Sequence, residues 1–191
     1  MTATEITYVR RMVEARYYPE ALYFGTLILG REATPELHLH LGISCLASVR
    51  PVAEVQRMLD GNESIGVGGL RVGFATLLPH EGFAHLLAAQ RLSKEVTIER
   101  GLLPAVKEVL EDLSTYLRTE LHGFARAPYR VNRRDAAKAS LLLLSRWAGL
   151  GNPTDFEADE IKRLDGLIQR ELLESVLDAE FVGGQPPPAP S

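Results

Sequence analysis

The sequence NRRDAAKASLLLLSRWAGLG, residues 132–151, carries the clearest structural signal in the chain. Asn132 is a favoured residue for capping the start of a helix, and Gly149 and Gly151 favour its end. Between them the residues are apolar on nearly every face, above all in the run of four leucines at 141–144. A helix without a polar face is typically buried. We therefore expect residues 133–150 to form a central helix on which others pack.

Amphipathic helices are predicted on both sides of this segment. Apolar residues recur at helical spacing in the ranges 5–14, 19–30, 35–46, 50–59, 79–92, 102–122 and 154–176. Helix-start signals precede three of them: Thr34 before Pro35, and the capping-box pairs Thr2 with Glu5 and Thr154 with Glu157. Gly123 suits the end of the helix before it. The pattern predicts an all-α fold.

Residues 64–78 interrupt the helical pattern, because glycines alternate there with apolar side chains. A short β-hairpin, a glycine-rich loop and a loosely packed helix all fit such a pattern, and we expect an irregular connector. The run Gly66–Arg71 lacks the Gly-Lys-Ser/Thr ending of a phosphate-binding loop and the third glycine of a dinucleotide-binding turn. No nucleotide cofactor is therefore expected.

Residues 4–59 carry Tyr18-x-Glu20-Ala21-Leu22, then Leu41-Gly42 with Cys45, then Pro51-x-Ala53. On these residues the segment resembles a tetratricopeptide-like array of helical hairpins. The resemblance implies paired helices that approach closely at the small residues Ala21, Gly42 and Ala53. It also implies a scaffold or chaperone, since such arrays present long surfaces that bind peptides or partner helices.

The expected architecture is an array of tetratricopeptide-like hairpins packed on a C-terminal helical bundle. We assign residues 1–61 to the hairpins, 62–78 to the glycine-rich connector, 79–182 to the bundle and 183–191 to a disordered tail. The tail contains the run GGQPPP, which can neither bury apolar surface nor continue a helix.

Composition narrows the classes of function. The 191 residues are 46% hydrophobic and carry a formal net charge of -4, which disfavours a dedicated nucleic-acid binder. Cys45 is the single cysteine, so the chain forms no intramolecular disulfide, and we expect Cys45 to be buried as a small apolar residue. No stretch has the layout of a signal peptide or a membrane helix, so a cytoplasmic location is expected.

The histidines do not show the spacing of a metal site on one helix. His38 and His40 are two residues apart and would point to different faces. His80 and His85 flank Glu81 in a pattern similar to that of zinc proteases, but they lie about 140° apart around a helix of roughly 3.6 residues per turn. We therefore expect no metal. The serines and carboxylates show no catalytic motif either, so no catalytic residue is assigned.

The strongest charge feature is a basic cluster with a single acid, Asp135, inside it. Its members are Arg126, Arg130, Arg133, Arg134 and Lys138, and Tyr129 lies among them. Two interpretations stay open. In the first, the cations pair with the acidic residues of 155–165 or are simply solvated. In the second, they form a docking site for an acidic partner or for nucleic acid.

We therefore expect a non-enzymatic adaptor, chaperone or assembly subunit, which associates with another protein or peptide or, as a homo-oligomer, with itself. Its candidate partner-binding residues are Tyr17, Tyr18, Arg126, Arg130, Arg133, Arg134 and Lys138. The alternative is a nucleic-acid-associated regulator that uses the basic cluster from Arg126 to Lys138. A metal-dependent enzyme built on His80, Glu81 and His85 is a third hypothesis.

Overall fold

The computed structural model describes residues 2–50, 66–67, 70–71, 78–120 and 130–183, and it confirms the all-α prediction. The elements are α1 (Thr2–Glu14), α2 (Tyr18–Leu29), α3 (Pro35–Ala47), β1 (Gly66–Val67), β2 (Leu70–Arg71), α5 (Pro79–Leu92), the 3₁₀ turn η2 (Arg100–Leu102), α6 (Leu103–Thr119), α7 (Arg133–Trp147) and α8 (Ala158–Gly183). Within these ranges, every helix is too short or too polar to cross a bilayer.

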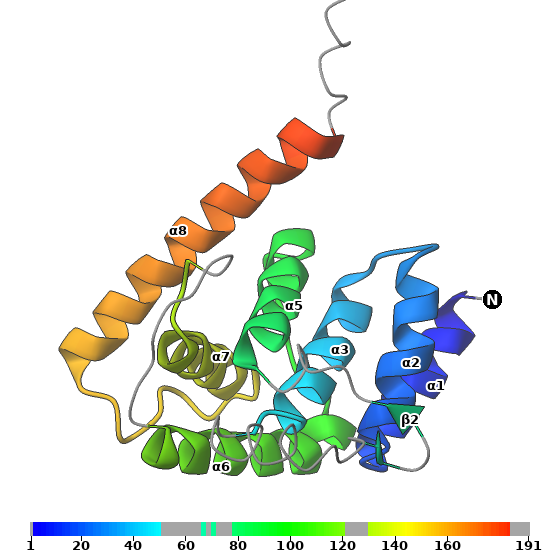
Figure 1. Ribbon diagram of the computed structural model, residues 1–191, viewed down its shortest axis with the longest axis horizontal. Coiled ribbons are helices and arrows are strands. Elements are labelled where there is room, and N and C mark those ends of the chain that lie inside the picture. Colours follow the sequence, from blue (N-terminus) through cyan, green and yellow to red (C-terminus); the bar gives the residue numbers. More distant parts are fainter. Residues whose placement is uncertain (1, 51–65, 68–69, 72–77, 121–129, 184–191) are drawn as a thin grey trace, which may run out of the picture.

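Helix α7 occupies the central position that its sequence predicts. The Asn132 side chain accepts a hydrogen bond from the backbone N–H of Asp135 at 2.8 Å, which caps the helix start. Residues 141–144 are at most 4% exposed, because α5, α6 and α8 pack around them (Figure 1). The helix ends at Trp147, slightly earlier than expected, and Gly149 follows with a φ of 73°.

Helices α1, α2 and α3 form a packed layer at one end of the molecule (Figure 1). Thr34 caps α3 as expected, since its hydroxyl accepts a hydrogen bond from the N–H of Leu37 at 3.1 Å. Helix α2 buries Ala21, Gly25 and Ile28, which share one face at helical spacing. The opposite face of α2 therefore points away from the core.

Among the described helices, α3 and α5 share the most extensive contact, and two glycines face each other in it. A Cβ atom on Gly42 would lie 2.7 Å from Leu86 Cδ2, and one on Gly82 would lie 2.6 Å from Leu46 Cγ. A large side chain at either position would force the helices apart. Gly42 is thus a close-contact residue, as the sequence suggests, but it contacts α5, which lies outside residues 4–59.

Several predicted helix ends were wrong. Helix α1 already includes Thr2, so Thr2 does not stand before it as a cap. Helix α8 begins at Ala158, and the carbonyl of Glu157 accepts its first backbone bond from Ile161 at 3.0 Å. Thr154 lies in the preceding turn and is too far upstream to cap α8.

Other predicted segments differ in extent. Helix α6 ends at Thr119 and Glu120 follows it, whereas residues 121–122 of the predicted range, with Gly123, lie outside the described residues. The predicted helix at 50–59, including Ala53, also lies outside them except for Arg50, which is not helical. In the connector, the described residues form a minimal antiparallel pair in which Gly66 faces Arg71 and Val67 faces Leu70. Helix α8 continues through Gly183, the first residue assigned to the tail.

Candidate functional site

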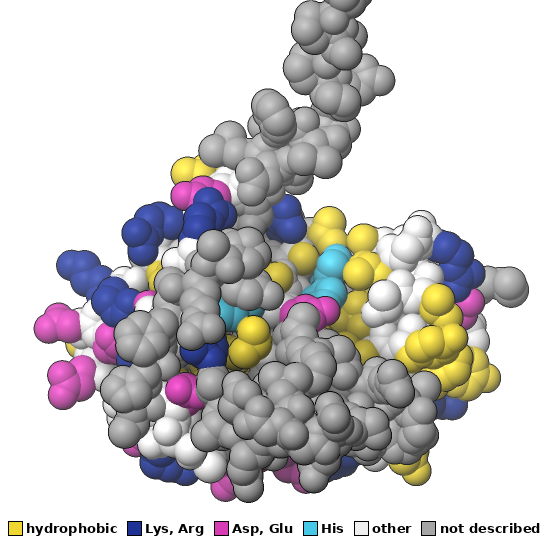
Figure 2. Space-filling view, viewed as in Figure 1, with side chains coloured by type: hydrophobic (Ala, Val, Ile, Leu, Met, Phe, Trp, Pro, Cys, Tyr) yellow, Lys and Arg dark blue, Asp and Glu magenta, His cyan; other side chains and the backbone are white. Residues whose placement is uncertain are grey.

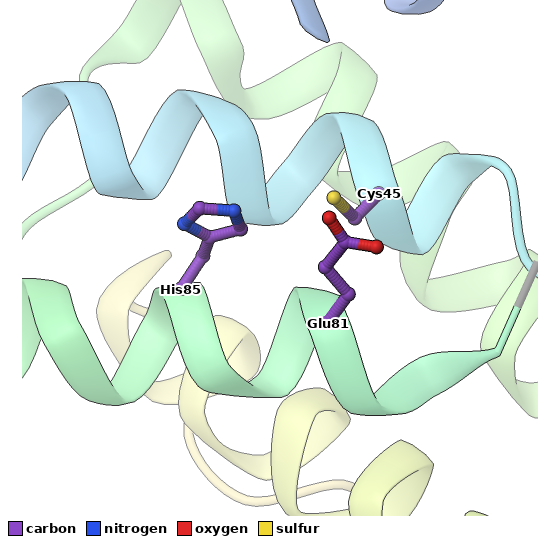
Figure 3. Close-up of side chains that lie close together, drawn as sticks. All are labelled: Cys45, Glu81 and His85. Carbon is purple, nitrogen blue, oxygen red and sulfur yellow. The ribbon is translucent and has the colours of Figure 1, made fainter. Parts of the chain in front are cut away.

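Three potential metal ligands from two helices meet beside the glycine contact. Cys45 on α3 and Glu81 and His85 on α5 place one ligand atom each within 4.8 Å of one another (Figure 3). Glu81 and His85 are four residues apart and so share one face of α5. Cys45 follows Gly42 by about one turn, and Glu81 directly precedes Gly82. The close approach of the glycines therefore brings these side chains together.

A second histidine extends this group. His38 on α3 lies beside His85, with their Nδ1 atoms 3.0 Å apart. Since two N–H groups cannot face each other at that distance, one ring donates a hydrogen bond and the other accepts it. We call the set His38, Cys45, Glu81 and His85 the α3–α5 cluster.

Burial disfavours the charged forms of the α3–α5 cluster. It raises the pKa of the fully buried Cys45 thiol and that of the half-buried Glu81 carboxyl. Burial, followed by the neighbouring His38, lowers the pKa of His85 to about 4. Burial, followed by the charge of Arg91, also lowers the pKa of His38. Both histidines are therefore neutral at physiological pH, and each keeps a ring lone pair that can accept a hydrogen bond or bind a cation.

Of the motif His80, Glu81 and His85, only two residues belong to the α3–α5 cluster in the structure. Glu81 and His85 lie together, but the Nε2 atom of His80 is 2.7 Å from the carbonyl oxygen of Val131, away from the cluster. Cys45 is buried, as expected, but sequence reasoning missed its position beside Glu81 and His85. The spacing of Glu81 and His85 was a usable signal, but the contribution of Cys45 depends on the packing of α3 against α5.

Two of the four described members of the basic cluster, Arg130 and Lys138, are paired with acidic residues of α8. Arg130 forms ion pairs with Glu174 and, at 3.6 Å, with Glu171. Lys138 pairs with Glu160 at 2.8 Å. Hydrogen bonds from Arg163 and then from Lys138 lower the pKa of Glu160 to about 2. These contacts agree with pairing to acidic residues, and extend it beyond the expected range of 155–165.

The other basic residues differ in their surroundings. Arg134 donates a hydrogen bond at 2.7 Å to the carbonyl of Leu117 and another to that of Glu120, at the C-terminal end of α6. A cation suits that end of a helix. Arg133 is half-buried in the first turn of α7, and Arg126 lies outside the described residues. The four members that the structure describes, Arg130, Arg133, Arg134 and Lys138, therefore do not form one exposed patch.

Exposed aromatic side chains lie on the outer side of α2. Tyr23, Phe24 and Leu27 are 54%, 45% and 55% exposed. The rings of Tyr23 and Phe24 meet edge to face with centroids 5.2 Å apart. Tyr17, just before α2, is exposed, whereas Tyr18 is half-buried. Figure 2 shows hydrophobic side chains gathered at the right-hand end of the molecule, where Figure 1 places α1 and α2. We call Tyr23, Phe24 and Leu27 the α2 outer face.

A pocket of about 460 Å³ lies between α1, the start of α3 and residues 93–102. Arg10 on its wall is ion-paired with Glu99 and, at 3.6 Å, with Glu14. His40 also lines the pocket, is 4% exposed, and its Nδ1 atom has no hydrogen-bond partner within the described structure. Burial, followed by the charge of Arg10, lowers the pKa of His40 to about 4. His40 is therefore a neutral core residue at physiological pH.

Comparison of the chain with protein-family models, with curated proteins and with solved structures found no match. The features of the chain that bear on its function are therefore the α3–α5 cluster, the basic residues and the α2 outer face.

Proposed function

We propose that this protein is a non-enzymatic adaptor, chaperone or assembly subunit that binds another protein through the α2 outer face. The observation that supports this most strongly is the exposure of Tyr23, Phe24 and Leu27 on one side of a helix whose other side packs in the core. Each exposes about half of its surface. Aromatic residues are enriched at protein interfaces because they bury a large area while losing little conformational freedom.

The chemistry of α2 indicates the kind of partner. Glu20 is the one charged residue between Tyr18 and Leu29, so the helix offers little for ionic recognition. Tyr23, Phe24 and Leu27 follow the spacing i, i+1 and i+4, which forms a short apolar stripe. Such a stripe suits an apolar face of a partner helix, as in helix-in-groove recognition. The proposed occupant is therefore an amphipathic helix of another protein.

The resemblance of residues 4–59 to tetratricopeptide-like hairpins supports the same proposal, because proteins of that kind typically serve as scaffolds and chaperones. The alternative use of the basic cluster for nucleic acid gains no support from its contacts. Arg130 and Lys138 face carboxylates, and Arg134 binds backbone carbonyls. Phosphate binding would require those cations to leave their present partners.

The test is a triple variant, Tyr23→Ser, Phe24→Ser and Leu27→Ser, used as bait with the full-length wild type. The matched control carries Leu150→Ser and Leu173→Ser, which alter two leucines that are 51% and 63% exposed and lie far along the chain. Each bait is immobilised, exposed to lysate from the source cell and analysed by quantitative mass spectrometry. We expect at least one protein to be retained by the wild type and by the control but lost from the triple variant.

Circular dichroism melting accompanies the capture. The triple variant should unfold close to the wild-type temperature, because its three side chains are largely exposed. Equal capture by all three folded baits would contradict the proposal. Self-association that the triple variant abolishes, with no other protein lost, would also contradict it, because the occupant would then be a second copy of the chain.

A further inference from the structure

We propose that the α3–α5 cluster binds one divalent transition metal ion, Zn²⁺ by its donor chemistry, with Cys45, Glu81 and His85 as ligands and His38 as the hydrogen-bond partner of His85. The basis is the convergence of a sulfur, an oxygen and a nitrogen donor from two helices within 4.8 Å (Figure 3). The inference goes beyond partner binding and does not depend on it.

The distances are close to those of a formed site. Bonds to zinc of about 2.0–2.3 Å in a tetrahedron place ligand atoms roughly 3–4 Å apart. The three donor atoms already lie within 4.8 Å of one another. Side-chain movements of about an ångström would therefore bring them to the spacing of a tetrahedral zinc site. Glu81 and His85 are half-buried, which leaves an ion a route from solvent to the fully buried Cys45.

The donor set selects the class of metal. Thiolate is a soft ligand that Mg²⁺ and Ca²⁺ do not favour, whereas zinc binds mixed sulfur, nitrogen and oxygen sets. A Cys45 thiolate, a Glu81 carboxylate and a neutral His85 carry two negative charges, which a divalent ion neutralises. Burial otherwise penalises those negative charges, so the ion would supply the compensation that this partly buried location lacks.

The contact between the histidines fits a ligand with a supporting partner. The Nδ1 atom of His85 is 3.0 Å from that of His38. Figure 3 shows one ring nitrogen of His85 directed toward Cys45 and Glu81, with the other directed away from them. If Nδ1 of His85 donates its hydrogen to His38, Nε2 keeps a lone pair for the metal. A metal-bound histidine commonly has its other N–H engaged in this way, which fixes its tautomer and orientation.

The helices hold the ligands in place. Gly42 and Gly82 let the two helices approach closely, since a Cβ atom would lie 2.7 Å or 2.6 Å from a leucine side chain of the facing helix, and the ligands lie within one turn of these glycines. Ligands on closely packed helices are better fixed than ligands on loops. Binding would join Cys45 Sγ to the metal and release the thiol proton to solvent, so affinity should fall as the pH is lowered.

The experiment is a titration of the full chain, first freed of metal with a chelator, with Co²⁺ and with Zn²⁺. Co²⁺ reports its ligands, because a thiolate bound to it gives a charge-transfer absorption in the near ultraviolet. We expect one equivalent to bind with that absorption, Zn²⁺ to displace Co²⁺, and either ion to raise the melting temperature.

Variants assign the ligands. Cys45→Ser should abolish the charge-transfer absorption, and Glu81→Gln and His85→Gln should each weaken Zn²⁺ binding by more than about 100-fold, beyond the roughly 10- to 100-fold expected for the supporting residue in His38→Leu. His80→Gln on α5 and His40→Gln on α3 are matched controls, since both histidines lie outside the cluster. These controls should bind Zn²⁺ like the wild type.

Circular dichroism of the metal-free variants shows which of them are folded, and Cys45→Ala replaces Cys45→Ser if the latter is not. Failure of the folded wild type to bind one equivalent would overturn the proposal. Binding without the thiolate absorption, or equal affinity in the wild type and in folded His85→Gln, would overturn it as well.

Discussion

His40 illustrates how strongly the fold controls a single side chain. Its imidazole is 4% exposed and lies beside Arg10, so both desolvation and a nearby positive charge oppose protonation. The pKa of His40 is therefore lowered to about 4 from an ordinary value of 6.5. The core therefore favours the neutral form of His40 over the charged form.

This environment predicts a pH dependence of stability. Between pH 6.5 and about 4 the unfolded chain binds a proton at His40 and the folded chain does not, so the free energy of unfolding should fall as the pH falls. The shift corresponds to on the order of 3 kcal/mol. Below about pH 4 both states are protonated at this residue, and its contribution becomes constant.

The measurement is urea denaturation of the wild type and His40→Gln at a series of pH values. Because other histidines also titrate, the prediction concerns the difference between the two proteins. His40→Gln should lose less stability than the wild type between pH 6.5 and 4. If the stability of the two proteins fell in parallel over that interval, His40 would take up a proton as readily in the folded protein as in the unfolded chain, and the prediction would be wrong.

At the scale of elements, the contact between α3 and α5 determines both the packing of these helices and the position of the α3–α5 cluster. Gly42 and Gly82 face each other, so the helices approach until Leu86 and Leu46 cover the glycines. The same approach places Cys45 beside residues of α5. Packing and the α3–α5 cluster therefore depend on one contact.

Gly42→Leu tests this contact. The added side chain would collide with Leu86 and with the backbone of Gly82, so we expect it to destabilise the protein by about 1–3 kcal/mol or more. Gly42→Ala is the matched control. Its Cβ meets mainly the flexible end of Leu86, and alanine favours the helix by roughly 0.5–1 kcal/mol, so its net effect should be small.

Thermal and urea denaturation of both variants give the comparison. If Gly42→Leu were as stable as the wild type, the surface of α3 at this point would have to be open. The packing of α3 on α5 described above would then be incorrect.

At the scale of the whole molecule, helical periodicity and caps predicted most of the fold. Asn132 and Thr34 were found as helix caps because capping depends on neighbouring residues, and the leucines at 141–144 indicated a central helix because no face was polar. The box of Thr154 and Glu157 was wrong. Its spacing fits a cap, but the chain makes another turn before α8 begins.

The candidate sites were less predictable because they depend on contacts between distant residues. Glu81 and His85 share a helix face and could be paired from the sequence, but Cys45 joins them through packing between α3 and α5. The acidic partners of Arg130 are Glu171 and Glu174 on α8, and the whole of α7 separates them from Arg130 along the chain. The exposure of Tyr23 and Phe24 depends on which face of α2 meets the core. The tetratricopeptide-like arrangement stays a prediction, since residues 51–59 lie outside the described structure.

The central claim, that the α2 outer face binds a partner protein, is tested most directly by site-specific photocrosslinking in the source cell. The photoreactive residue p-benzoylphenylalanine replaces Phe24 in one version of the full chain and the exposed Leu173 of α8 in the other. After irradiation, we expect a discrete crosslinked product to another protein from position 24 and none of that mass from position 173. A folded protein that gives no product from position 24, or the same products from both positions, would contradict the claim.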